Sequence, residues 1–210
     1  INTLSPGDNN YTQILTSIAV VPKTLYYLGT IPSKRLPSVA IVGTRKPTPY
    51  GKEVTNRLAS ELAGRGIIIV SGMALGVDGI AHQAAIDAGG STIAVQANGL
   101  DRLYPSSHRQ LGENIIKTGG AIISEYEPTE SPRLWRFLER NRIVSGLSDA
   151  VLITEASARS GTLNTAKFAL EQGKEVFVVP GNITSPQSSG CNARIRQGAI
   201  PVTKVEDILE

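Results

Sequence analysis

A glycine-rich turn between an apolar run and a helical pattern constrains this chain most. Residues 67–82 read IIIVSGMALGVDGIAH, in which four consecutive apolar residues lead into Ser71-Gly72 and then into Gly76 and Gly79. The order indicates a buried strand, a tight turn and a helix start, as found at the ligand edge of open α/β sheets. Glycines allow close backbone approach and a helix N-terminus favours anions, so the turn suits a phosphate. The alternative is a tight strand-to-helix connection in which Asp78 only starts the helix.

The same alternation of strand and helix extends over most of the chain. Apolar runs followed by helical patterns predict strands at 39–42, 67–70, 92–96, 121–124, 150–154, 175–179 and 199–202. The intervening patterns predict helices at about 50–65, 80–88, 107–117, 162–172, 192–197 and 205–209. Such continuously apolar strands predict an α/β fold with a mostly parallel sheet covered by helices on both faces.

Two segments follow from this reading. Residues 1–37 are interpreted as a lead-in packed on the main domain, with coil at 1–10, a short helix at 11–18 and a strand at 24–28. Residues 38–210 are interpreted as the main domain. Because the carboxyl ends of parallel strands share one sheet edge, we expect the loops at 43–46, 71–78, 99–101 and 155–162 to converge on one crevice.

Composition narrows the class of protein. The formal net charge of +3 is a mild basic excess that is compatible with anionic partners. A single cysteine, Cys191, excludes an internal disulfide and a cysteine-based zinc site, so we expect a reducing cytoplasmic environment. No apolar run approaches the roughly 20 residues of a membrane helix, and no signal peptide is evident, so no membrane partner is expected.

Common catalytic motifs are absent. The chain has no G-x-S-x-G, H-E-x-x-H, Walker A or G-x-G-x-x-G pattern, and its two histidines, His82 and His108, have no partner at metal-ligand spacing. His82 is interpreted as a packed or capping residue. Glu155, at a strand end in the expected crevice, has two readings: an organiser of its loop by hydrogen bonding, or an acid in catalysis. We therefore predict a protein that is not an enzyme and has no cofactor or metal.

Two basic segments carry the positive chemistry. Gly43-Thr44-Arg45-Lys46 places a hydroxyl, a guanidinium and an ammonium directly after a strand, where they suit a phosphate or form a solvated loop. Residues 133–142 read RLWRFLERNR. A helix there would put Arg133, Arg136 and Arg140 on one face and Trp135, Leu138 and Arg142 on another. Interleaved arginine and aromatic residues suit a single nucleic-acid strand, although an amphipathic helix with snorkelling arginines explains the run equally well.

At this point the residues resemble a known family. VAIVGTRKPTPYG (39–51), SGMALGVDGIAHQAA (71–85), GLDRLYP (99–105), ISEY (123–126), RNRIVSGLSDAVLITEASARSGTLNTAKFAL (140–170), VFVVPGN (176–182) and SSGCNARIRQGAI (188–200) closely resemble blocks of the DprA/Smf family of DNA-processing proteins. The resemblance implies an extended Rossmann-like fold, single-stranded-DNA binding, loading of the RecA recombinase during natural transformation, and a homodimer. It implies a binding protein rather than an enzyme.

The resemblance also implies a set of DNA-phosphate-binding residues. By position they are Gly43, Thr44, Arg45, Lys46, Ser71, Gly72, Gly76, Arg109, Arg140, Asn141, Arg142, Ser160, Gly161, Thr162 and Asn192. Leu138 departs from the family, which usually has proline there, so we expect a different approach to Arg140. The front helical domain and rear winged-helix domain of many members are not among the matched blocks, and we expect a core that carries neither.

Two alternatives stay open. Related folds host nucleotide N-glycosidases with a P-G-G-x-G-T loop and a glutamate, and Ser160-Gly161-Thr162 after Glu155 partly echoes that pattern. A small-nucleotide-binding protein is the other alternative. The leading hypothesis is a single-stranded-DNA binder with little base specificity.

Overall fold

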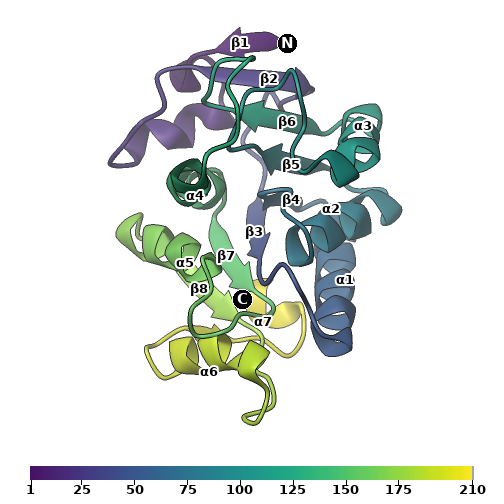
Figure 1. Cartoon of the computed structure of the whole chain (residues 1–210), viewed down its shortest axis with the longest axis vertical. Helices are drawn as coiled ribbons and strands as arrows, with labels where there is room; N and C mark the ends of the chain where they lie inside the picture. The colour runs from purple at the N-terminus through teal and green to yellow at the C-terminus, as the bar shows by residue number, and fades with distance from the viewer. Residues whose placement is uncertain (210) are drawn as a thin grey trace.

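The computed structural model describes residues 1–209, which form one sheet between two layers of helices (Figure 1). The sheet has nine strands in the order β1-β2-β6-β5-β4-β3-β7-β8-β9. The strands are β1 (Asn2–Leu4), β2 (Leu25–Gly29), β3 (Ser38–Val42), β4 (Ile68–Ser71), β5 (Thr92–Val95), β6 (Ala121–Ser124), β7 (Ala150–Ile153), β8 (Glu175–Val178) and β9 (Ile200–Pro201). Strands β3 to β9 pair in parallel, whereas β2 pairs antiparallel with both β1 and β6.

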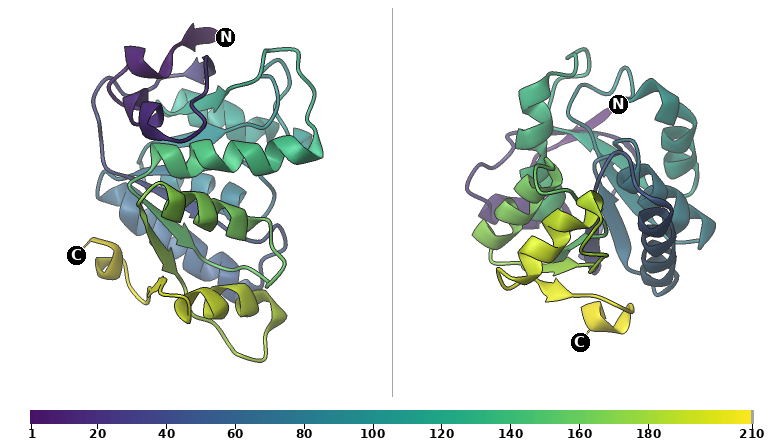
Figure 2. Two further views of the ribbon diagram at one scale, coloured as in Figure 1. Left: turned by 90° about the vertical axis from the view of Figure 1, so that its left-hand side faces the viewer. Right: turned by 60° about the horizontal axis from the view of Figure 1, so that its bottom comes forward.

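The helices cover both faces of the sheet. The α-helices are α1 (Pro49–Gly64), α2 (Val77–Asp87), α3 (Arg109–Lys117), α4 (Leu134–Leu147), α5 (Thr162–Glu171), α6 (Ser189–Ile195) and α7 (Glu206–Leu209). Short 3-10 helices are η1 (Pro6–Asp8), η2 (Thr12–Ser17), η3 (Ser106–His108) and η4 (Pro186–Ser188). Figure 1 shows α1 to α3 on one side of the sheet and α4 and α5 on the other, and Figure 2 shows α4 and α5 side by side.

Alternation along the buried strands builds a core on each face. In β3, Val39 and Ile41 join the apolar cluster under α1 and α2, whereas Ala40 and Val42 join the cluster under α4, α5 and η2. All five residues of β3 are buried, which explains why the strand reads as a continuous apolar run. The predicted α/β fold with a mostly parallel sheet is confirmed.

The N-terminal segment differs from the expectation of coil. Residues 1–10 contain β1, which pairs with β2, and η1. Both β1 and β2 extend the common sheet rather than pack on it. Leu15 of η2 lies against α4, because a Cβ at Gly146 of α4 would be only 2.7 Å from Leu15 Cδ2. β1 is only three residues long and two of the three are exposed, so it carries no apolar run that predicts a strand.

The strand order creates a switch point between β3 and β7. From β3 the chain moves outward through β4, β5 and β6, then returns to place β7 on the other side of β3. The loops that follow β3 and β7 therefore diverge in opposite directions, which leaves a crevice at their carboxyl ends. This position is where open α/β sheets bind their ligands.

His82 is a buried residue of α2 with an internal partner. Its Nδ1 lies 2.7 Å from Thr92 Oγ1, and that hydroxyl donates to Ile69 O at 2.7 Å, so Nδ1 is the donor to Thr92. Burial, aided by the positive charges of His108 and Arg140, lowers the pKa of His82 to about 3. The interpretation of His82 as a packed residue therefore agrees with its surroundings.

Acid is expected to destabilise the fold through His82. Its pKa is about 3 when folded against 6.5 ordinarily, so between these values the unfolded chain binds one more proton. The free energy of unfolding therefore has its full value above pH 6.5. It falls by about 1.4 kcal/mol per pH unit as the pH is lowered from there toward 3. Urea unfolding from pH 4 to 7 should show a shallower pH dependence for His82→Asn than for wild type. Equal slopes would contradict the assignment.

Candidate functional site

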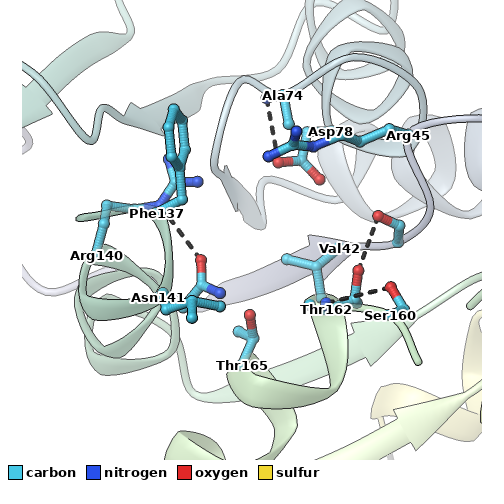
Figure 3. Close-up of a pocket in the computed structure, with 13 residues that line it drawn as sticks. Val42, Arg45, Ala74, Asp78, Phe137, Arg140, Asn141, Ser160, Thr162 and Thr165 are labelled. Carbon is cyan, nitrogen blue, oxygen red and sulfur yellow. Dashed lines mark hydrogen bonds between the residues drawn. The ribbon is translucent and has the colours of Figure 1, made fainter. Parts of the chain in front are cut away.

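A polar pocket occupies the switch point of the sheet (Figure 3). It encloses about 210 Å³ between the loop after β3, the turn before α2, the first half of α4 and the loop into α5. The lining residues are Val42, Gly43, Arg45, Ala74, Asp78, Phe137, Leu138, Arg140, Asn141, Ser160, Gly161, Thr162 and Thr165. The predicted crevice is thus formed by three of the four loops that were expected to converge, because residues 99–101 line a different hollow.

The loops after β3 and β7 are tied together at Gly43. Thr44 N donates to Glu155 O at 2.7 Å, and Thr162 Oγ1 donates to Gly43 O at 2.9 Å. A Cβ at Gly43 would lie 2.6 Å from Val77 Cγ2 and 2.9 Å from Glu155 O, so a side chain has no room there. The absence of a side chain at Gly43 therefore lets both halves of the sheet meet.

Arg140 is a buried cation at the back of the pocket. It is 4% exposed, and its Nη1 donates to the carbonyl oxygens of Gly72, at 2.7 Å, and of Val95. A Cβ at Gly72 would lie 2.7 Å from Arg140 Cζ, so the glycine lets the guanidinium reach the strand ends. Burial lowers the pKa of Arg140 to about 10, which keeps it charged at neutral pH. Its Nη2 donates to no acceptor among the described residues.

Asp78 organises the turn beside that cation. Its Oδ2 accepts hydrogen bonds from Gly72 N at 3.1 Å and Ala74 N at 3.3 Å. Burial raises the pKa of Asp78, and the positive charge of Arg140 opposes that rise. The alternative interpretation gave Asp78 only a role in starting the helix, but its carboxylate also fixes the backbone of the glycine-rich turn.

Arg45 and Phe137 form the mouth of the pocket. Arg45 is exposed, and its Cζ lies 5.5 Å from the centroid of the Phe137 ring. The Phe137 and Tyr104 ring centroids are 5.5 Å apart with the rings tilted by 53°. Arg45 makes no ion pair or side-chain hydrogen bond with any described residue, so its guanidinium is available to a ligand. A smaller hollow lies beyond Phe137 and is lined in part by Gly72, Gln96 and Tyr104.

Seven of the predicted phosphate-binding residues line this pocket together. They are Gly43, Arg45, Arg140, Asn141, Ser160, Gly161 and Thr162. Gly72 lines the adjoining smaller hollow, and Lys46 and Gly76 line a groove on the other side of Arg45. The side chain of Thr44 accepts from Lys46 N at 3.2 Å within its own loop.

Arg142 lies away from the pocket. It is buried, and its two terminal nitrogens donate to the Glu125 carboxylate at 2.5 and 2.6 Å. Its Nε and Nη1 also donate to the carbonyls of Val20 and Glu139, at 3.0 and 3.1 Å. With these donors engaged inside the fold, Arg142 is not placed to hold a ligand in the pocket.

Three other predicted residues are also separate from it. Ser71 is fully buried and donates through Oγ to Ile41 O at 2.6 Å. Arg109, on α3, has an 80% exposed side chain paired with Glu113 at 3.2 Å. The amide of Asn192, on α6, bonds both backbone groups of Gly181, at 3.2 and 3.0 Å. Each side chain therefore has a structural partner elsewhere.

The arginine run on α4 does not form an exposed basic face. Arg136 is 6% exposed, pairs with Glu130 at 2.8 Å and lies between the rings of Tyr126 and Trp135. Arg133 precedes the helix at its N-cap. The helical spacing was predicted correctly for Arg136 and Arg140. The acidic segment before α4 folds back and pairs with Arg136 and Arg142, whereas Arg133 lies exposed ahead of the helix.

The surroundings of Glu155 favour the first of its two interpretations, an organiser of its loop by hydrogen bonding. Its carboxylate is 2% exposed and accepts from Thr48 N at 2.8 Å and Thr48 Oγ1 at 2.6 Å. Thr48 in turn is the N-cap of α1 and accepts from Gly51 N. Glu155 therefore organises the entry to α1 by hydrogen bonding. Sequence reasoning did not assign a role to Tyr104 or Gln96. The block GLDRLYP contains Tyr104 and was the only signal for it, and no motif pointed to Gln96.

Other classes of site lack support in the described part of the chain. Within residues 1–209 no group of three or more His, Cys, Asp or Glu side chains is placed to hold a metal ion. Across the same residues, every helix is too short or too polar to cross a membrane.

Comparisons with known proteins identify relatives of the whole core. A family model described as DNA recombination-mediator protein A matches residues 2–210. The DNA processing protein DprA of Bacillus subtilis is 43% identical over 100% of this chain and 71% of its own length. Protein Smf of Escherichia coli K12 is also 43% identical, over 99% of this chain but 56% of its own length.

Solved structures agree. The X-ray structure of DprA from Streptococcus pneumoniae matches 99% of this chain and 73% of its own, at 38% identity and a TM-score of 0.92. Helicobacter pylori DprA, studied for its single-stranded-DNA binding mode, matches 94% of this chain and 90% of its own, at 37% identity and a TM-score of 0.85. A molybdenum cofactor binding protein from Rippkaea orientalis, 20% identical at a TM-score of 0.59, shares the fold alone. A match over nearly every residue, in sequence and in structure, means that the chain belongs to the DNA recombination-mediator protein A (DprA/Smf) family.

Proposed function

We propose that this chain binds single-stranded DNA at the switch-point pocket. One observation carries the proposal: an unpaired Arg45 lies over the ring of Phe137 at the mouth of a pocket that holds a second cation, Arg140. A guanidinium offers a planar fork to a phosphate, and an aromatic ring offers a stacking surface to a base. A nucleotide of a single strand carries both a phosphate and a base whose face is free to stack.

The shape of the site favours a single strand over a duplex. Reading a duplex requires an element that projects into a groove, such as a helix or a pair of strands. Here the cations lie in and around a concavity, with Arg140 almost fully buried. A nucleotide can enter such a pocket only if it is free of its complementary strand.

The wider role rests on the family. The matched relatives are DNA-processing and recombination-mediator proteins, and the Helicobacter pylori relative binds single-stranded DNA. We therefore infer that the chain protects incoming single strands in the cytoplasm, passes them to a RecA-type recombinase, and acts as a homodimer. We also infer binding without catalysis, because Glu155, which an N-glycosidase mechanism would need free, is engaged by Thr48.

Fluorescence anisotropy tests the proposal. A labelled single strand of about 20 nucleotides and a matching duplex are titrated over a range of salt concentrations. We expect preference for the single strand, with log K falling by about 0.7 per log unit of salt for each phosphate neutralised. Incubation with nucleoside monophosphates should release no base. Equal affinity for strand and duplex, or saturation by a mononucleotide with no gain for oligomers, would contradict the proposal.

A further inference from the structure

A second basic groove adjoins the pocket on the side away from α4. It crosses the exposed side of α2 between the start of α1 and the end of η3, and shares only Arg45 with the pocket. Its lining residues are Arg45, Lys46, Pro47, Lys52, Gly76, Gly79, Ile80, Gln83, His108 and Leu111. A ligand held by Arg45 can therefore continue into this groove without leaving the protein surface.

The charge of the groove is uncompensated. None of its lining residues is acidic, and neither Lys46 nor Lys52 makes an ion pair or side-chain hydrogen bond with a described residue. Elsewhere, exposed cations such as Arg57, Arg65 and Arg109 pair with acids. The groove thus gathers three unpaired cations, Arg45, Lys46 and Lys52, on one hollow of the surface, where they can act together on an external anion.

Lys52 carries a positive charge at a position where positive charge destabilises its own helix. Its N–H makes the first hydrogen bond between residues four apart in α1, to Thr48 O at 2.9 Å, so the lysine lies in the first turn. The N-terminal turn is the positive end of the helix dipole, where an acidic side chain stabilises and a basic one destabilises. The first turn of α1 contains no acidic residue of its own. Thr48 and the Glu155 carboxylate already cap this end of α1, so the cap does not need Lys52, and its exposed charge is open to an external anion.

The opposite side of the pocket is unsuitable for a phosphate backbone. There Arg136 and Arg142 are already neutralised by Glu130 and Glu125. The hollow beyond Tyr104 is lined by Asp101 and Glu130 together with Arg102, so it lacks the excess of positive charge found in the groove. Attraction on the groove side alone gives the strand a preferred direction.

We propose that a single strand bound in the pocket passes Arg45 and runs through the groove over α2, with Lys52 as a phosphate contact. This route rests on the proposed function and extends the site beyond the pocket. Gly76 lets the loop after β3 pack on the start of α2 at the edge of the groove, where a Cβ would be 2.5 Å from Thr44 O. Gly79 also lets the His108 ring lie against α2, where a Cβ would be 2.6 Å from His108 Cε1.

The test compares strand lengths in a charge-matched pair of variants. Lys52→Glu reverses charge in the groove, and Lys34→Glu reverses an exposed lysine that has no described ion pair and lines neither the pocket nor the groove. Anisotropy is measured for oligothymidylates of about 4 and about 20 nucleotides over a salt series, a range that spans common site sizes. Thermal unfolding without DNA is recorded for both variants.

We expect Lys52→Glu to weaken binding of the long strand about tenfold more than Lys34→Glu. Its salt dependence should be shallower by at least about 0.7, the value for one lost phosphate contact. The short strand, held in the pocket, should bind equally to both variants, and the unfolding midpoint of Lys52→Glu should be no lower than that of wild type. Equal losses for long and short strands, or no difference from Lys34→Glu, would overturn the route but leave the pocket intact. Failure of wild type to bind either strand would overturn both proposals.

Discussion

Arg45→Ala is expected to weaken the binding of single-stranded DNA by about 10- to 100-fold. A hydrogen bond to a charged group contributes about 1.5–3 kcal/mol, and each 1.4 kcal/mol is a factor of ten in affinity. Because Arg45 is exposed and makes no ion pair or side-chain hydrogen bond with a described residue, its removal takes away the proposed ligand contact and leaves no buried group unsatisfied. Anisotropy with a labelled oligothymidylate measures the loss, and urea unfolding should show unchanged stability.

Two further variants sharpen that result. Arg45→Lys retains the charge but loses the planar fork and weakens the contact with Phe137, so its affinity should lie between those of wild type and Arg45→Ala. Arg196→Ala is the control. Arg196 is exposed, lies outside the pocket and makes no side-chain contact with a described partner, so its removal should change the affinity for DNA little. If Arg45→Ala binds as well as Arg196→Ala, the pocket does not hold the phosphate.

Arg142→Ala is expected to lower the free energy of unfolding by about 3–5 kcal/mol. Loss of the guanidinium leaves the Glu125 carboxylate, only 15% exposed, without its cation, and a broken buried pair typically has this effect. The carbonyls of Val20 and Glu139 lose a donor as well. Urea denaturation at neutral pH measures the change.

The double variant Glu125→Leu/Arg142→Leu separates this role from ligand binding. Replacement of both charges by apolar side chains removes the unpaired carboxylate, so most of the lost stability should return. Binding of DNA by the double variant should then be close to that of wild type. A variant of Arg142 that keeps full stability but loses DNA binding would instead identify this arginine as a ligand contact.

The fold was predictable because its strands are buried on both faces. Every residue of β3 and β4 is buried, residues 39–42 and 67–70 read as unbroken apolar runs, and glycines or loops separate the strands from the helices. The edge strand β1 was missed because its three residues are mostly exposed and its pairing with β2 depends on a partner more than 20 residues away in the chain. Short edge strands carry too little local pattern to distinguish them from coil.

The candidate site was predictable only where backbone chemistry determines it. Gly43, Arg45 and the 160–162 loop follow strand ends, and the sheet itself brings them together. The position of Arg142 outside the pocket was not predictable, because its side chain is held by Glu125, which lies in an irregular segment whose path no periodicity describes. A run of arginines shows where charge lies along the chain, but not which acids fold onto it.

The bonds of Arg140 constrain how this pocket can diverge among relatives. The same guanidinium that charges the pocket also holds the carbonyl ends of β4 and β5 through Gly72 and Val95. A substitution there alters ligand affinity and loosens the sheet edge together, so few residue types are tolerated. Arg45, which only contacts the Phe137 ring, makes no hydrogen bond that holds the sheet edge. We therefore expect natural variation that tunes the proposed affinity for DNA to occur at Arg45 and in the groove beyond it, while the architecture keeps Arg140 unchanged.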